Sequence, residues 1–407
     1  MRTAAPNGRV SAAAPPHPCW LDVDLDSIGQ NVRTLRAMVG PATQIAAVVK
    51  AEAYGLGSAA VAEAALAAGA AWLAVARVAE GVDLRRAGIE APILNLAYMA
   101  PGEAATLLEH NITPTVADIQ TARVLADAVP AGKSIAIHLK VDTGLSRFGA
   151  QPAELELLLD FLAEAQSLRV EGLCSHFATA DEADRSFAQE QLRSFFAAQR
   201  VVEASGHRPR VRHVANSAAA LSLPESRLDL VRLGITLSGH YPSAQVPTTV
   251  ALHPAVAFKA RLARVYKLPT GASVGYGRTF VSQRAMRAAV VPVGYADGLP
   301  RSHSNRGKVL IRGQRVPLVG RVSMDQCVVD VTELPEARPG DEVVLFGRQG
   351  AAEIDLHEFA TWGDTIAHEA LCRIGPRVPR CYLAGGQIRR IGWIGRASAT
   401  PCYALPS

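Results

Sequence analysis

The feature that most constrains the fold is a repeated unit, a short β-branched strand followed by an Ala- and Leu-rich helix, that runs through about the first 240 residues. Helical stretches such as 58–68, 152–165 and 187–204 are long enough to cross from one parallel strand to the next. Eight such repeats predict an α/β fold with a (β/α)₈ barrel of the TIM type. The eight strands are expected at 44–49, 72–77, 92–96, 112–116, 134–141, 168–174, 210–214 and 230–237.

Beyond about Pro242 the pattern changes to alternating strands separated by Gly and Pro turns, as in 257–267, 288–293, 316–322 and 342–346. This pattern of short strands and turns predicts a second, mainly-β domain. The segment 20–24 is typical of a strand entering a helix, and the pattern alone does not assign it to either domain. The expected organisation is a disordered tail at 1–18, a barrel at 19–250, a β-rich domain at 251–388 and a C-terminal tail at 389–407.

Composition excludes several classes of protein. A hydrophobic content of 49% over 407 residues supports sizeable cores, which excludes a disordered chain. The net charge of +5 is scattered and aromatic content is only 5%, so we expect no nucleic-acid partner. The six Cys are widely spaced and form no C-x-x-C pair, which disfavours a zinc cluster or a disulfide framework. Without a secretory signal or a long apolar run, the chain is expected to be soluble, cytoplasmic and free of membrane and metal.

Polar residues from five of the expected barrel strands, which end, follow or lie on those strands, are expected to converge at the carboxyl ends, where barrel enzymes place their active sites. Any one of them alone is more often a surface or capping residue, but their shared position favours a common site. They are Lys50, Arg147, His176, Asn216, Ser217 and Arg232.

Lys50 ends an apolar strand and opens a Gly-rich turn. Partial desolvation of an amine there lowers its pKa and favours Schiff-base chemistry with an aldehyde cofactor, although an isolated lysine at a strand end more often extends to solvent. Ser217 and the backbone around Gly234 and Ile235 follow the last two strands, where barrels commonly bind a phosphate group. Without Lys50, Ser217 and the Gly234 backbone would be interpreted as parts of ordinary turns.

The motif Val-Val-Lys50-Ala-Glu-Ala-Tyr54-Gly resembles the cofactor-binding signature of the alanine racemases, which are pyridoxal 5′-phosphate enzymes of fold type III. The resemblance covers about 20–382. Further matches follow in order at 139–147, 175–181, 216–217, 232–235, 275–277, 294–298, 320–325 and 377–380.

The resemblance implies a racemase that interconverts L- and D-alanine with two bases, Lys50 on one face of the cofactor and Tyr276 from a partner subunit on the other. His176, held by Arg232, would assist the tyrosine, and the Arg232 guanidinium would donate to the pyridine nitrogen. Such an enzyme is an obligate homodimer with shared active sites, and it supplies D-alanine for peptidoglycan or degrades alanine.

The resemblance also assigns binding roles. Arg147, assisted by the backbone at Met324, would reach the cofactor phenolic oxygen and the substrate carboxylate, with Asp325 beside them; Tyr295 would restrict entry to small substrates. Lys140 matches a position that is carbamylated in some relatives. The expected contacts to the cofactor, besides Lys50, are Tyr54, Arg147, His176, Asn216, Ser217, Arg232, Gly234 and Ile235.

One departure bears on the substrate. Pro376 stands where many relatives carry a tyrosine that narrows the pocket, so we expect turnover of serine or another slightly larger amino acid beside alanine. The pattern also leaves open a serine or broad-specificity racemase, a basic amino-acid decarboxylase of similar layout and a non-catalytic carrier of the cofactor. A metalloenzyme is disfavoured because His368-Glu369 has no second His four residues on.

Overall fold

The computed structural model describes residues 15 and 17–395, which form two compact units. One unit comprises Leu25–Ala255 with Ala367–Cys372, and the other comprises Val256–Ile366 with the described residues before Leu25 and from Arg373 on. The tail expected at 1–18 lies outside the described residues except for 15, 17 and 18. Within the described chain, no helix is long and apolar enough to cross a membrane.

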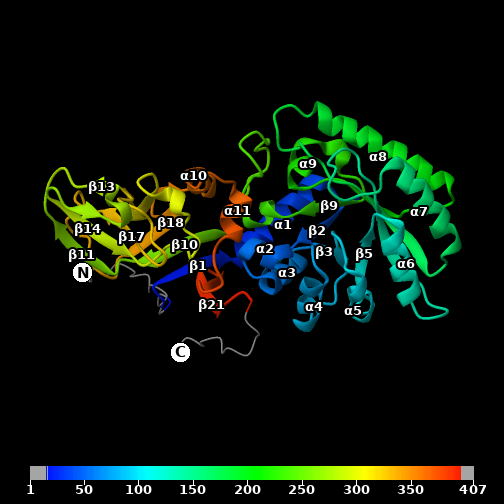
Figure 1. Ribbon diagram of the computed structural model, residues 1–407, viewed down its shortest axis with the longest axis horizontal. Coiled ribbons are helices and arrows are strands. Elements are labelled where there is room, and N and C mark those ends of the chain that lie inside the picture. Colours follow the sequence, from blue (N-terminus) through cyan, green and yellow to red (C-terminus); the bar gives the residue numbers. More distant parts are fainter. Residues whose placement is uncertain (1–14, 16, 396–407) are drawn as a thin grey trace, which may run out of the picture. The chain divides into compact units, whose positions relative to one another are not determined.

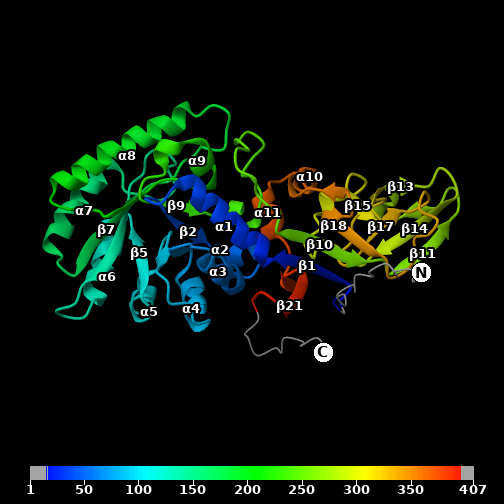
Figure 2. The ribbon, with the colours of Figure 1, turned by 180° about the vertical axis from the view of Figure 1, so that it is seen from behind.

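The first unit is the predicted barrel, with eight parallel strands inside a ring of helices (Figures 1 and 2). Its first and last strands pair directly, and the segments around the last two are joined by backbone bonds from Asp229 N to Arg212 O and from Arg232 N to Ala215 O. The strands are β2 (Gln44–Val48), β3 (Trp72–Val75), β4 (Ile93–Asn95), β5 (Ile112–Val116), β6 (Ile135–Lys140), β7 (Leu168–Cys174), β8 (Val211–His213) and β9 (Leu230–Leu233).

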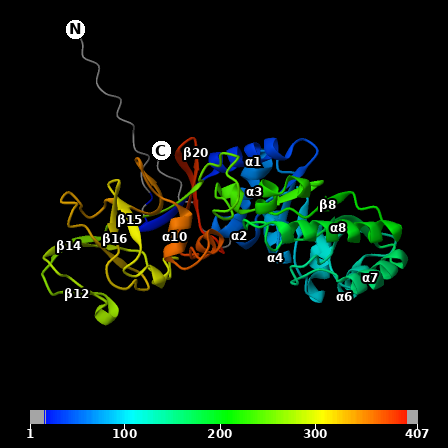
Figure 3. The same ribbon diagram turned by 90° about the horizontal axis from the view of Figure 1, so that it is seen from above.

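The helices of this unit cover the strands with their apolar faces. In α1, the buried Ile28, Val32 and Leu35 recur at helical spacing, and this helix packs beside α3 (Figure 3). The helices are α1 (Leu25–Val39), α2 (Lys50–Gly55), α3 (Ser58–Ala67), α4 (Val78–Arg86), α5 (Ala104–Glu109), α6 (Ile119–Ala128), α7 (Pro152–Glu164), α8 (Ser186–Ala204), α9 (Ser217–Ser222) and α11 (Ala367–Cys372), with short 3₁₀ turns η1 (Pro101–Glu103), η2 (Pro224–Ser226) and η3 (Ile235–Ser238).

The last barrel strand is shorter than the expected 230–237. It ends at Leu233, and Gly234 turns the chain into η3. The apolar run continues through Leu237, but its residues are buried by the 3₁₀ turn and not by strand pairing.

The second unit is mainly β, as expected. Its largest sheet has the order β16-β15-β18-β10-β1-β20-β21, with β19 beside β18; β11-β14-β17 and β12-β13 form smaller sheets. The elements are β1 (Cys19–Asp24), β10 (Val256–Arg261), β11 (Arg264–Leu268), β12 (Ser273–Val274), η4 (Tyr276–Arg278), β13 (Phe280–Val281), β14 (Met286–Val291), η5 (Arg301–His303), β15 (Lys308–Ile311), β16 (Gln314–Pro317), β17 (Cys327–Asp330), β18 (Glu342–Gln349), β19 (Ala352–Ile354), α10 (Leu356–Trp362), β20 (Arg380–Ala384) and β21 (Gln387–Gly392).

Strand β1 resolves the position of the segment that the sequence pattern left open. It pairs antiparallel with β10 and parallel with β20, so residues 19–24 lie in the β-rich unit, although they fall inside the range expected for the barrel. At the other end, β21 pairs with β20 as far as Gly392, inside the expected C-terminal tail. The single strand expected at 257–267 is two strands, interrupted at 262–263.

Candidate active site

Lys50 lies just beyond the carboxyl end of β2, where the chain makes an unusual turn. The four residues Ala51–Tyr54 have φ angles between 51° and 60°, which is a left-handed turn built without glycine. L-residues in this conformation cost about 1–2 kcal/mol each. The surrounding structure must therefore hold the turn in place.

Two carboxylates provide that support. Glu80 accepts hydrogen bonds from the backbone N–H of Ala51 at 2.6 Å and, through its other oxygen, from Ala76 at 2.8 Å. Glu52 accepts from the backbone N–H and the hydroxyl of Ser58, both at 3.0 Å. The turn after Lys50 is thus tied to the start of α4 and to the start of α3.

The surroundings of Lys50 lower the pKa of its amine. Burial lowers the pKa of Lys50, and the positive charge of Arg147, on the loop after β6, lowers it further. Burial also lowers the pKa of Lys140 to about 8; its ammonium nitrogen lies 4.9 Å from the Phe148 ring centre. The barrel mouth therefore holds two lysines that are more easily deprotonated than free lysine.

Arg232 is buried at the centre of a hydrogen-bond network. Its Nη1 donates to His213 Nδ1 at 2.6 Å and to His213 O at 2.8 Å. Its Nη2 donates to the carbonyls of Ser175 and Val214 and to His176 Nδ1 at 3.1 Å. Burial, followed by the charge of Arg232, holds the pKa of His176 well below its usual value, so this imidazole is neutral.

Beside this network, a compact cradle combines the turn after Lys50 with the ends of β8 and β9. A Cβ on Gly234 would lie 2.1 Å from Tyr54 Oη, so only glycine lets the phenol reach this backbone. Ser217 Oγ accepts from Gly234 N at 3.0 Å and lies 3.1 Å from Thr236 Oγ1. Asn216 caps α9 by accepting from Ala219 N, and Ile235 begins η3 beside the cradle.

The remaining candidate residues lie in the β-rich unit. Tyr276 opens η4 and is 71% exposed. The turn that carries it packs against Arg321, because a Cβ on Gly275 would meet Arg321 N at 3.1 Å. Tyr276 is therefore held on a supported turn with its side chain largely exposed.

Tyr295 and Met324 lie on two loops joined by backbone hydrogen bonds, from Tyr295 N to Ser323 O at 3.1 Å and from Ala296 N to Met324 O at 3.0 Å. Arg377 joins the same two loops through side chains. It donates to Asp297 at 2.7 and 3.1 Å and to Asp325 at 2.7 Å. Tyr295 and Met324 thus lie on two loops that are joined by backbone and side-chain hydrogen bonds.

The structure gathers the predicted residues into two groups, one per unit. The barrel group is Lys50, Tyr54, Arg147, His176, Asn216, Ser217, Arg232, Gly234 and Ile235; the β-unit group is Tyr276, Tyr295, Met324 and Asp325. Sequence reasoning gave no role to Glu80, His213 or Thr236. His213 could have been found, because it ends the strand before Asn216 and Ser217.

Comparison with known proteins decides the family. The model described as the alanine racemase N-terminal domain matches residues 23–242, and the one described as its C-terminal domain matches 255–382. The chain belongs to the alanine racemase family. It is 46% identical to an alanine racemase of Symbiobacterium thermophilum, over 91% of this chain and 98% of the relative. It is 42% identical to an alanine racemase of Desulfovibrio desulfuricans, over 90% of this chain and 98% of the relative.

Solved alanine racemase structures share the fold. That of Streptomyces lavendulae superposes with a TM-score of 0.88 at 40% identity, covering 91% of this chain and 98% of its own. That of Bacillus anthracis, determined with bound L-Ala-P, has a TM-score of 0.88 at 35% identity, covering 93% and 99%. Both units of the chain therefore have counterparts in the alanine racemases.

Proposed function

We propose that this protein is an isomerase that interconverts L- and D-alanine, using pyridoxal 5′-phosphate bound through Lys50. The observation that carries the proposal is the likeness to alanine racemases along about nine-tenths of the chain. A lysine with a lowered pKa, in the same turn as the Tyr54 that forms the cradle with Ser217 and Gly234, adds support.

The residues present fit the cofactor. Lys50 offers an amine whose pKa is lowered by burial, and imine formation with an aldehyde requires the deprotonated amine. Ser217 Oγ, Tyr54 Oη and the backbone beside Gly234 converge at the carboxyl end of the last strands, where they would hold a phosphate. When bound, pyridoxal 5′-phosphate supplies an electron-withdrawing ring that acidifies the α-proton of an amino acid.

Racemisation requires a proton to leave one face of the α-carbon and another to arrive on the opposite face. The Lys50 amine would serve one face, since its lowered pKa lets it both take and return a proton. The phenol of Tyr276, supplied by a second copy of the chain, would serve the other. Neutral His176, whose Nδ1 accepts from Arg232, would carry its proton on Nε2 and donate a hydrogen bond to the oxygen of that phenol.

Arg232 and Arg147 would each donate hydrogen bonds, the first to the cofactor ring and the second to the substrate carboxylate. Within the described part of the chain, the hydrogen bonds of Arg232 leave from Nη1 and Nη2, so its Nε–H would be left to donate to the pyridine nitrogen. A donor there would keep that nitrogen unprotonated. Arg147, on the exposed loop after β6, would pair with the substrate carboxylate, and the backbone at Met324 and the side chains of Asp325 and Tyr295 would border the substrate.

This assignment requires a homodimer whose active sites combine the barrel of one copy with the Tyr276 turn of the other. The high exposure of Tyr276 and Met324 in a single chain supports it. We further propose a cytoplasmic location and a role in supplying D-alanine for peptidoglycan or in degrading alanine.

The test is chiral chromatography of L- and D-alanine incubated separately with purified protein and pyridoxal 5′-phosphate. Both samples should converge on equal amounts of the two enantiomers, and Lys50→Ala should abolish conversion. Release of carbon dioxide from lysine, ornithine or arginine without racemisation of alanine would instead indicate a decarboxylase. Binding of the cofactor with neither reaction would indicate a carrier.

A broader substrate range is a second candidate, favoured by the exposed Pro376. Proline is smaller and lacks the aromatic ring and the hydroxyl of the tyrosine that many relatives carry at this position. We expect serine to be racemised at a detectable rate beside alanine, and Pro376→Tyr to reduce the serine rate more than the alanine rate. Turnover of alanine alone by the unaltered protein would refute this second candidate.

A further inference from the structure

A pair of buried histidines lies next to Arg232 in the barrel. His138 on β6 and His213 on β8 are both fully buried, and His138 Nδ1 lies 2.8 Å from His213 Nε2. His213 Nδ1 in turn accepts from Arg232 Nη1 at 2.6 Å. The proposed chemistry uses Arg232 but gives no role to His138.

The fold makes specific provision for His138. Strands β6 and β7 change register at this residue, with Ile137 opposite Val170 and His138 opposite Gly172, so Glu171 is the extra residue of a β-bulge. A Cβ on Gly172 would lie 2.5 Å from the His138 ring, so only glycine leaves room for the imidazole. Trp72 packs on the same ring with 5.5 Å between centroids.

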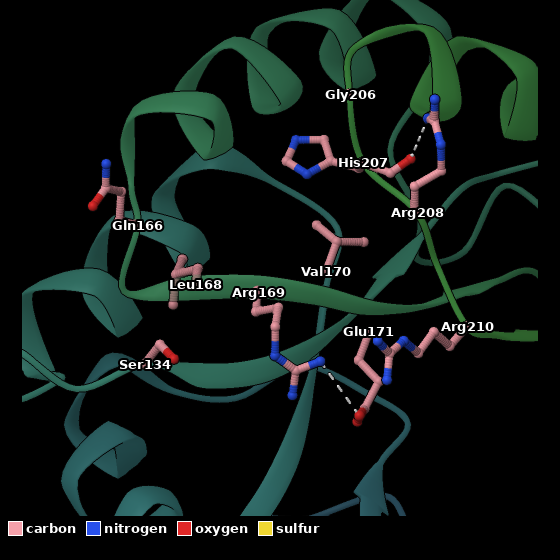
Figure 4. Close-up of a pocket in the computed structure, with 10 residues that line it drawn as sticks. All are labelled: Ser134, Gln166, Leu168, Arg169, Val170, Glu171, Gly206, His207, Arg208 and Arg210. Carbon is pink, nitrogen blue, oxygen red and sulfur yellow. Dashed lines mark hydrogen bonds and ion pairs between the residues drawn. The ribbon is translucent and has the colours of Figure 1, made fainter.

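The bulge also brings a carboxylate to the far side of the ring. Glu171 Oε2 lies 4.0 Å from His138 Nε2. Figure 4 shows Glu171 beside Arg169 at the edge of a pocket at the amino ends of β6, β7 and β8, the end of the barrel opposite Lys50. Neighbouring side chains therefore follow one another from Glu171 to His138, His213 and Arg232.

The chemistry of these groups fixes where each proton lies. A guanidinium only donates, so His213 Nδ1 must accept and His213 carries its proton on Nε2. That proton is donated to His138 Nδ1, so His138 carries its own proton on Nε2, facing Glu171. Burial lowers the pKa of His138 to about 3, and burial together with the Arg232 charge lowers that of His213, so both rings are neutral.

We infer that His138 is a positioning residue, which acts through His213 to fix the guanidinium of Arg232 in the orientation that leaves its Nε–H free for a ligand. The inference rests on the proposed role of Arg232. Without the acceptor on His138, the buried Nε2–H of His213 has no partner, and the ring gains by moving its proton to Nδ1. The new Nδ1–H of His213 then faces the Nη1–H of Arg232, and because both groups are donors, Arg232 is displaced.

The first test reads the tautomers directly. Full-length protein with ¹⁵N-labelled histidine rings, loaded with pyridoxal 5′-phosphate, is studied by NMR at pH 7.5, with signals assigned through His138→Asn and His213→Asn. We expect Nδ1 unprotonated and Nε2 protonated in both residues. A proton on Nδ1 of either ring would overturn the inference. Expected tautomers in a protein that does not racemise alanine would refute the proposed function alone.

The second test compares two substitutions in the racemisation assay. The oxygen of His138→Asn can accept where Nδ1 does, whereas His138→Leu provides no acceptor. The Leu variant should lose about tenfold in kcat with the KM for alanine within about twofold, because the groups are misplaced but still present. The Asn variant should stay within about threefold of the unaltered protein. Equal losses in both folded variants, or no loss in either, would overturn the inference; if the Leu variant does not fold, the tautomer measurement still decides.

Discussion

The hydroxyl of Tyr54 occupies the space above Gly234: a Cβ on that glycine would lie 2.1 Å from Tyr54 Oη and 2.7 Å from Tyr54 Cζ. These two residues come from opposite ends of the barrel sequence, and their contact closes the cradle proposed for the phosphate. Gly234 is buried, and the turn that carries the phenol is held by hydrogen bonds to Glu80 and Glu52, so neither can move away easily.

Gly234→Ala should therefore weaken cofactor binding. The added methyl group must displace the Tyr54 ring, and we expect the Kd for pyridoxal 5′-phosphate to rise at least about tenfold, which corresponds to about 1.4 kcal/mol. Titration of apoprotein with the cofactor, followed by absorbance, measures this. Gly102→Ala is the matched control, since its Cβ would meet no atom within 4 Å, and it should leave the Kd unchanged. Equal affinities for the two variants would contradict the proposed cradle.

The support of the left-handed turn by Glu80 leads to a second prediction. Glu80→Ala leaves the backbone N–H groups of Ala51, Ala76 and Arg77 without their carboxylate acceptor. We expect the free energy of unfolding to fall by about 2–3 kcal/mol and Lys50 to bind the cofactor more slowly. Chemical denaturation and the rate of cofactor loading measure the two effects.

Glu103→Ala is the control for that experiment. Glu103 accepts from the backbone N–H of Ala100 at 2.8 Å, a bond of similar kind that caps η1 far from Lys50 in sequence. This variant should cost about 1 kcal/mol and leave the loading rate unchanged. If both variants slow loading equally, the turn does not depend on Glu80.

The barrel could be predicted because its signal is repeated. Each strand is a short apolar run and each helix has its own periodicity, so an error in one unit does not change the count. The turn at Ala51–Tyr54 could not be predicted, because Ala-Glu-Ala-Tyr is compatible with an ordinary right-handed helix. Its hand depends on Glu80, which arrives from the following strand–helix unit.

Similar limits apply to the site. Strand ends placed Lys50, His176 and Arg232 at one mouth, because parallel strands end on the same side. The role of His138 follows from a bulge and from Gly172, which only the paired strands reveal. The contribution of Tyr276 from a second copy stays a prediction, since it depends on an assembly and not on the folding of one chain.

The low pKa of Lys140 predicts a pH dependence of stability. Its pKa of about 8 in the folded protein lies below the unfolded value of about 10.4, so the unfolded chain binds the proton more tightly. The free energy of unfolding should therefore rise with pH between about 8 and 10.4. Below about pH 8 the full cost of burying the charged Lys140 amine, about 3 kcal/mol, is present.

Lys140→Met removes this titration while keeping an unbranched buried side chain. We expect the variant to be more stable than the unaltered protein at pH 7, with the difference shrinking as the pH rises to 10. Chemical denaturation at pH 7, 8, 9 and 10 measures the difference directly, so titrations common to both proteins cancel. A difference that does not change with pH would show that burial of the charged amine is not the cause.

The joining of two loops by Arg377 gives the last prediction. Asp297 is buried and receives two hydrogen bonds from the Arg377 guanidinium; without them it keeps the bond from Gly294 N, and its charge loses its partner. Arg377→Ala should therefore lower the free energy of unfolding by about 2 kcal/mol, a value kept small because the arginine is partly exposed. Since the loops carry Tyr295 and Met324, the KM for alanine should rise about fivefold or more while kcat falls less.

Arg284→Ala is the control for this experiment, because it breaks an exposed ion pair with Glu333 in the same unit. It should change the free energy of unfolding by less than about 0.5 kcal/mol and leave the KM for alanine unaltered. A similar response in both variants would show that Arg377 forms only a surface ion pair.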